Sequence, residues 1–484
     1  MLDSNLVDRW PLLVAALLCC AAGARADEPA PADAERIRLL ERRLEQLEAE
    51  SRARHAQEPV VAPPAVVSAA IAPPADPRRV PVSAFWRDGF NLESADKANR
   101  LHVGGIVQAD GRYFPGNTAA GPVDAFVLRS ARIELEGTLG RYVNFRLLPD
   151  FANGTLQLME GYAEIAFASW LRLRVGKYKP PFGLERLQYE ANTIFVERGY
   201  PTSLSPNRDI GAMLAGEALD ATVVWSVGVF NGSGDNSTAD AELDDDKELI
   251  ARLFAHPFRK TRFAFLRDLG IGGAASFGQA RGTLAKGIVT TAALPSDKTD
   301  GQVVFFRYAS TAASTDDDTA YAAGRRYRAA AQGYYYFWRL GVLGEYVWNQ
   351  QAVRLGPIPA PVAVAREAWQ VYASFLLTND KASFGGVKPA SPVEFARGGG
   401  AGAWEIALRY SNLSVDGAVF DNKFADITKS ARSATSYTAG LNWYLNANAK
   451  VQLDFVRTDF SGGAAAGANR PSENAVLGRL QYSL

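Results

Sequence analysis

Apolar and cationic side chains alternate with a period of two where the chain reads LRLRVGKYKPPFGLE, at residues 171–185. One face of the predicted strand carries two leucines and a valine, and the other carries Arg172 and Arg174. Runs of similar length and alternation, many with aromatic ends, follow one another through most of the remaining chain. This repetition predicts an all-β fold, a transmembrane antiparallel β-barrel with lipid outside and cationic side chains in an aqueous lumen.

The alternation places strands in most of the chain after residue 100. They are predicted at residues 102–113, 126–136, 144–150, 159–167, 171–178, 210–217, 221–230, 249–258, 326–337, 340–348, 368–377, 404–411, 438–445, 451–460 and 475–484. The stretch 263–308 shows no clear alternation. With about 25 residues for each strand and its connection, the roughly 400 residues after position 85 hold about 16 strands.

The connection that begins near residue 180 and ends near residue 209 is far longer than a hairpin turn. Connections of that length are uncommon and usually functional, so we expect this one to fold into the lumen and constrict it. Cations at the strand end and in the loop are the candidate constriction residues: Lys177, Lys179, Arg186, Arg198 and Arg208. Glutamates in the same loop either neutralise it in part or anchor it to the wall: Glu185, Glu190 and Glu197.

Strand parity directs further arginines towards the lumen, opposite apolar neighbours. These channel-lining candidates are Arg132, Arg146, Arg172, Arg174 and Arg409. A guanidinium group stays charged at any relevant pH and offers forked donors to an oxyanion. One interpretation is a partial arginine ladder that conducts anions. The other is a wall stiffened by ion pairs with inward carboxylates such as Glu134, Glu136 and Glu164. For Arg172 and Arg174, beside the expected constriction loop, the ladder is favoured.

The first 84 residues read differently from the rest. An apolar run followed by Ala24-Arg25-Ala26 predicts a signal peptide over residues 1–26. Leucine and isoleucine at 3-4-3 spacing predict a short helix at 34–55, which is either a coiled coil in an oligomer or a solvated single helix. Residues 56–84 are rich in proline and alanine and predict a linker. The barrel domain is expected over residues 85–484.

Charge and hydropathy narrow the function classes. The chain has 52 basic and 52 acidic residues, so any anion preference must come from the local placement of charge. No basic domain stands out, which counts against nucleic-acid binding. No run past residue 30 is long and apolar enough for a transmembrane helix, so a membrane must be crossed by strands.

Several blocks of the sequence resemble the phosphate-selective porin O and P family of outer-membrane proteins. The blocks lie at residues 128–152, 161–167, 174–185, 196–211, 227–235, 402–413 and 441–455. The resemblance implies a sixteen-stranded barrel in the bacterial outer membrane, a homotrimer, and an anion-preferring channel. It also implies that the third loop folds into the lumen, and here that loop corresponds to residues 180–209.

We therefore expect an outer-membrane porin for phosphate or polyphosphate, with a general, weakly anion-selective porin as the alternative. The expected partners are small anions, outer-membrane lipid and lipopolysaccharide. Acidic runs at 244–246 and 316–318 fall in predicted outer loops, where they are solvated or bridge to lipopolysaccharide through cations. An enzyme is disfavoured, because three histidines occur without a G-x-S-x-G elbow, a metal-ligand cluster or a Walker loop. Neither a cofactor nor a metal is expected.

Overall fold

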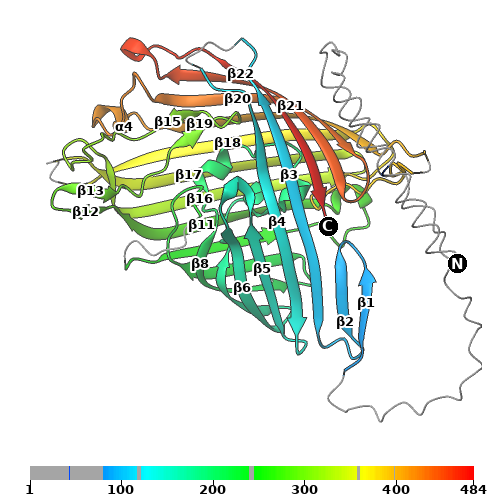
Figure 1. Cartoon of the computed structure of the whole chain (residues 1–484). Coiled ribbons are helices and arrows are strands. Elements are labelled where there is room, and N and C mark those ends of the chain that lie inside the picture. Colours follow the sequence, from blue (N-terminus) through cyan, green and yellow to red (C-terminus); the bar gives the residue numbers. More distant parts are fainter. Residues whose placement is uncertain (1–42, 44–79, 117–120, 239–244, 357–359, 397) are drawn as a thin grey trace, which may run out of the picture. The chain divides into compact units, whose positions relative to one another are not determined.

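The structure is a computed structural model that describes residues 43, 80–116, 121–238, 245–356, 360–396 and 398–484. Sixteen antiparallel strands close into a barrel (Figure 1), which confirms the predicted fold. They are β3 Arg100–Tyr113, β4 Ala125–Leu139, β5 Val143–Asp150, β6 Gln157–Ala168, β7 Leu171–Tyr178, β8 Asp209–Ala218, β9 Val223–Phe230, β10 Glu248–Ala255, β11 Leu269–Arg281, β16 Tyr321–Phe337, β17 Leu340–Arg354, β18 Val362–Leu376, β19 Ala403–Val415, β20 Ala431–Tyr444, β21 Ala449–Gly462 and β22 Glu473–Ser483. The predicted signal peptide and, apart from residue 43, the predicted coiled-coil helix lie outside the described residues.

The last strand closes the barrel against the first. β22 pairs with β3 in antiparallel register, and the backbone N–H of Leu484 donates to the carbonyl of Gly105 at 2.8 Å. A hairpin of β1 Val82–Trp86 and β2 Phe90–Ser94 pairs with the same edge of β3, beyond the end of β22. This hairpin starts before residue 85, within the residues predicted as a linker. Closure leaves no free sheet edge in the wall.

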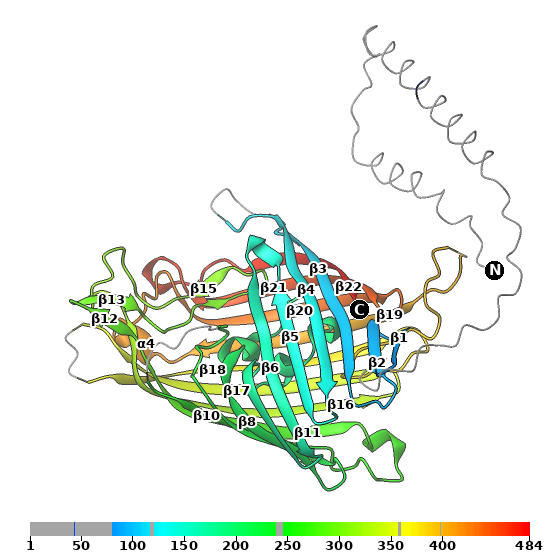
Figure 2. The same cartoon turned by 60° about the horizontal axis from the view of Figure 1, so that its bottom comes forward.

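The two ends of the barrel differ in their connections. Turns such as 140–142, 169–170 and 338–339 lie at the end that holds the C-terminus, although 256–268 and 377–402 there are longer. The opposite end carries long loops, including β12, β13 and α4, as Figure 2 shows. Outer-membrane barrels have short periplasmic turns and long extracellular loops. The C-terminal end is accordingly the periplasmic one.

The outer face carries aromatic side chains in two groups. Near the periplasmic turns, Trp404 and Trp443 stack with ring centroids 5.0 Å apart. Nearer the loops, the Tyr410 ring lies 4.9 Å from that of Trp369 and 5.1 Å from that of Tyr437. Girdles of this kind mark the two membrane–water interfaces of a barrel.

Several strands extend further towards the loops than the sequence predicted. β17 ends at Arg354 rather than 348, and β20 begins at Ala431 rather than 438. Outward positions in the added part of β17 are Gln350, Ala352 and Arg354, which are not lipid-facing residues. The hydrophobic alternation fades there because the strand has left the lipid. β11, in the stretch without clear alternation, was missed because glycine and alanine occupy most of its positions.

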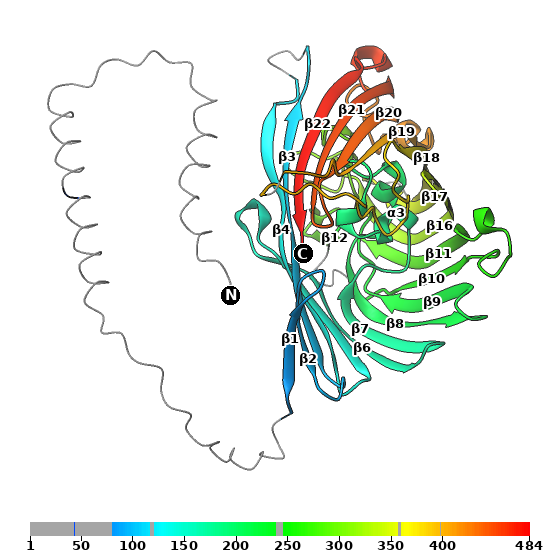
Figure 3. The same ribbon diagram turned by 90° about the vertical axis from the view of Figure 1, so that its right-hand side faces the viewer.

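The interior of the barrel is filled by two inward loops. The first is the lumen loop, residues 179–208, and Figure 3 shows its helix inside the ring of strands. The second is part of the long β11–β16 connection.

The remaining elements are β12 Thr283–Ala285, β13 Ile288–Thr291, β14 Asp297–Lys298, β15 Val304–Phe306, α3 Leu184–Leu187, α4 Ala418–Asp421, η1 Ala152–Gly154, η2 Glu190–Asn192, η3 Tyr200–Leu204, η4 Ala264–Leu266 and η5 Ala465–Gly467. No helix among the described residues is long and apolar enough to cross a membrane.

The lumen loop satisfies its backbone against the far wall. The N–H of Val196 donates to Asp454 Oδ2 on β21 at 2.7 Å, and the N–H of Tyr200 donates to Ser411 Oγ on β19 at 3.0 Å. The two inward loops also pack on each other, with the rings of Tyr200 and Phe305 edge to face at 5.8 Å. Both rings are almost completely buried. The hydrophobic core therefore lies inside the barrel and fixes both loops there.

A charge on the outer face should destabilise the barrel only between the girdles. Leu408 is outward-facing, 68% exposed, and lies between Trp404 and Tyr410 on β19. We expect Leu408→Arg to lower the free energy of unfolding by about 2–4 kcal/mol. Ser414→Arg, on the same face but beyond Tyr410, should cost at most about 1 kcal/mol. Denaturant unfolding from lipid vesicles measures both, and equal losses would contradict this membrane placement.

Candidate functional site

A polar cavity of about 100 Å³ lies between the lumen loop and the wall strands β3, β4 and β22. Its volume suits several water molecules or one small oxyanion. Guanidinium groups dominate its lining: Arg129, Arg132, Arg186, Arg198, Arg208 and Arg479. Only Glu190 and Glu197 contribute carboxylates to the lining. Six arginines against two glutamates make this cavity a candidate anion site.

A β-bulge in β4 brings two consecutive residues to the cavity. Gln108 of β3 pairs with Ser130, whereas the next residue of β3 pairs with Leu128, so Arg129 is the extra residue. Arg129 and Ser130 both line the cavity, and Leu128 faces outward. Strict parity would have turned Arg129 towards lipid, which is why the sequence pattern missed it. Arg479 lies opposite the outward Leu480 on β22, so parity alone could have identified it.

Glu190 holds the cationic groups of the site together. Its Oε1 lies 3.1 Å from Arg208 Nη2, 3.3 Å from Lys179 Nζ and 3.4 Å from Arg132 Nη1. Arg198 Nη2 is 3.8 Å away. Burial alone would raise the pKa of Glu190, but these cations hold it well below its usual range. Glu190 is therefore ionised at every relevant pH.

Two loop arginines are bound chiefly by uncharged oxygens. Arg198 donates to the carbonyls of Glu185 and Gln188, each at 3.0 Å. Arg186 donates to the carbonyl of Thr202 at 2.7 Å and to the side-chain oxygen of Asn236. Carbonyl and amide oxygens orient a guanidinium without cancelling its charge. These two groups account for much of the positive excess in the cavity.

The predicted constriction residues largely converge on this site. Lys179, Arg186, Arg198 and Arg208 lie within it or at its edge, as the Glu190 contacts and the cavity lining show. Lys177 is buried in β7 and does not line the cavity.

The predicted wall arginines are dispersed and each has a carboxylate nearby. Arg132 joins the cavity and also pairs with Asp150 at 2.7 Å. Arg409, only 1% exposed, pairs with Asp300 of the second inward loop at 2.8 Å. Arg146 pairs with Glu134 at 2.6 Å.

The remaining two candidates lie on β7. Arg174 pairs with Glu164 at 2.7 Å and stacks on the ring of Tyr162. Arg172 lies 3.8 Å from Glu217, next to the periplasmic turn and at the opposite end of β7 from the lumen loop.

Comparison with known proteins shows the family to which this fold and sequence are similar. Residues 101–484 match the family of phosphate-selective porin O and P. This chain belongs to that family. Porin O of Pseudomonas aeruginosa is 23% identical over 400 residues, which cover 77% of this chain and 85% of Porin O. The outer-membrane channel DcaP of Acinetobacter baumannii has a TM-score of 0.51 at 12% identity, over 82% of this chain and 99% of DcaP.

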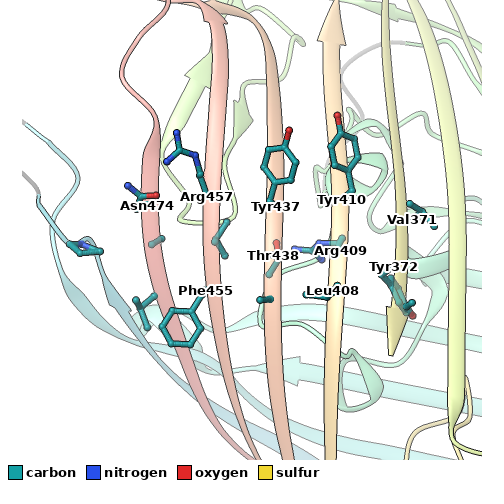
Figure 4. A pocket seen from close by; sticks show the side chains of 16 residues that line it. Val371, Tyr372, Leu408, Arg409, Tyr410, Tyr437, Thr438, Phe455, Arg457 and Asn474 are labelled. Atoms are coloured by element: carbon teal, nitrogen blue, oxygen red, sulfur yellow. The ribbon is translucent and has the colours of Figure 1, made fainter. Parts of the chain in front are cut away.

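Membership in this porin family identifies the chain as a channel of the bacterial outer membrane. A further hollow, of about 630 Å³, belongs to the outer wall rather than to the channel. It lies over β18 to β22, and the residues around it include the outward-facing Leu408, Tyr437 and Phe455 (Figure 4). Because these side chains point away from the lumen, the hollow is part of the lipid-facing porin surface. The arginine-rich cavity remains the site inside the barrel.

The charge of Lys179 should make anion binding in this porin depend on pH. Burial, assisted by the positive charges of Arg198 and Arg208, lowers the pKa of Lys179 to about 7 despite Glu190 nearby. The Lys179 side chain is thus positively charged below pH 7 and loses that charge above it, whereas the arginines stay charged. We expect sulfate, a dianion throughout, to block chloride current about tenfold less well at pH 8 than at pH 6.

Single-channel block in planar bilayers measures this difference between the two pH values. Lys179→Arg keeps the charge at both and should abolish the difference. An equally steep pH dependence in Lys179→Arg would show that another group is responsible.

Proposed function

We propose that this porin is an anion-preferring channel for phosphate or related oxyanions, and that the arginine-rich cavity is its principal binding site. The observation that carries the proposal is the excess of six arginines over two glutamates around one small cavity in the lumen. Guanidinium groups match the acceptor oxygens of phosphate with forked, charged donors. The balanced charge of the whole chain gives no such preference, so the selectivity is local.

The description of the family as phosphate-selective supports the same substrate class. A conducting site must attract an ion without retaining it. Several donors in sequence serve this purpose, because an anion passes between them without full dehydration at any one.

A general, weakly anion-selective porin is the second candidate. The observation that favours it is the pairing of wall arginines with carboxylates, as for Arg146, Arg174 and Arg409. A paired guanidinium contributes little field beyond its partner. In this case the cavity would raise anion occupancy slightly and phosphate would show no preference over chloride.

Bilayer recordings separate these functions. In a KCl gradient, the reversal potential of the purified channel should show anion selectivity, and phosphate should block chloride current at low concentration. Arg129→Ala and Arg198→Ala should each raise the blocking concentration of phosphate by about tenfold, because each variant loses one hydrogen bond from a charged donor to the anion.

Two variants act as comparisons in that experiment. Arg325→Ala removes an exposed, outward-facing charge on β16 and should leave the block unchanged. Arg172→Ala tests the arginine ladder, which predicts a weaker block despite its distance from the cavity. Cation selectivity of the native channel would overturn the proposal, and anion selectivity without phosphate block would favour the general porin.

We also propose that the protein is exported through the periplasm and assembles as a homotrimer. Strands β5, β7, β9 and β10 have eight residues each, and a membrane-spanning strand needs about 9–11. A part of the barrel wall with such short strands is stabilised when neighbouring subunits cover it. Native mass spectrometry in mild detergent should give three copies of the chain. A monomer that conducts would contradict this assembly.

A further inference from the structure

One carboxylate oxygen in the cavity occupies the position that a bound anion would take. Glu190 Oε1 lies within 3.1–3.8 Å of Arg208, Lys179, Arg132 and Arg198. A phosphate oxygen would have the same preferred neighbours, because guanidinium and ammonium groups donate to either oxyanion. Among the described residues, Glu197, the other glutamate of the cavity, has two cations within 4 Å, Arg112 at 3.4 Å and Arg129 at 3.6 Å, while Arg479 and Arg198 act on it from further away.

Only two of the four cations around Glu190 have another carboxylate within 4 Å among the described residues. Asp150 pairs with Arg132 at 2.7 Å, and Glu160 lies 3.4 Å from Arg208. Arg198 is otherwise bound by backbone carbonyls. Without the Glu190 carboxylate, four positive charges would face the cavity with two carboxylates behind them. Such a site would hold a divalent oxyanion strongly and release it slowly.

The backbone around Glu190 is anchored independently of its side chain. Ala191 O accepts from Lys450 Nζ at 3.0 Å and from Gln481 Nε2 at 3.1 Å. Thr193 O accepts from Lys450 Nζ at 2.7 Å. These wall contacts hold the loop in place, so the carboxylate can leave the four cations while η2 stays where it is.

We propose that Glu190 is a tethered competitor that fills the anion site when it is empty and is displaced by each oxyanion that binds. This role rests on the proposed anion channel and adds the residue that sets how long the anion stays. A tethered group competes at a high effective concentration, which lowers the apparent affinity for the free ion. The competition converts a trap into a site from which anions leave, as conduction requires.

The decisive variant is Glu190→Gln, which keeps the shape and removes the charge. Phosphate and sulfate should block its chloride current at concentrations at least about tenfold lower than in the native channel, with longer closures. Glu197→Gln removes the same charge from the same cavity but faces two cations, and its gain should stay below about threefold. An unchanged or weaker block in Glu190→Gln, or equal gains in the two variants, would overturn the role of Glu190.

Folding is monitored by the heat-dependent gel mobility of the barrel. Sulfate should raise the thermal midpoint of Glu190→Gln more than that of the native protein, because the vacated site binds it. If Glu190→Gln does not fold, the test uses Glu190→Asp, which shortens the side chain by one methylene. Block by phosphate at lower concentrations than in the native channel supports the role of Glu190. Block at the same concentrations as in the native channel refutes it. A native channel that phosphate does not block refutes the proposed function itself, whereas native block with no effect of either variant refutes only the role of Glu190.

Discussion

Charge buried inside the barrel must be compensated, and the loops supply the compensation. Arg328 and Arg366 have side chains at most 2% exposed, and both contact Asp235 from the β9–β10 loop. Arg366 also pairs with Asp297 of the second inward loop, and Arg328 pairs with Glu248. Removing one partner of a buried pair costs about 3–5 kcal/mol, because the other charge is left uncompensated. The inward loops are therefore constituent parts of the lumen.

The same constraint explains where a site for a moving anion can exist. Where the loops bring enough carboxylates, as around Arg409, the arginine belongs to the framework. Where guanidinium groups are satisfied by carbonyl oxygens, as for Arg186 and Arg198, their positive charge remains available to a ligand. The cavity beside the lumen loop is the place where the second case prevails. The function proposed for this barrel depends on incomplete local compensation rather than on the number of arginines.

The period-two alternation predicted the barrel because lipid on one side of the wall imposes a strict chemical difference between its faces. The length of the connection after residue 179 predicted that it would enter the lumen, and parity correctly turned Arg409 inward beside the outward Leu408. The partners of the arginines were beyond prediction. Asp300 comes from a stretch with no alternation, and a bulge reverses the parity of Arg129. Pairings between loops and wall depend on long-range packing, which no local pattern encodes.

Compensation by a single shared group has a consequence that compensation by separate pairs does not. When each arginine has its own carboxylate, as Arg146 has Glu134, an approaching anion meets a neutral pair and gains little. When four cations share Glu190 and only Arg132 and Arg208 have a second carboxylate nearby, the positive charges exceed the negative ones as long as Lys179 is protonated. The anion preference proposed for the cavity would thus survive small movements of the loop. A ladder of isolated pairs would lose its preference with each movement that brought a carboxylate closer.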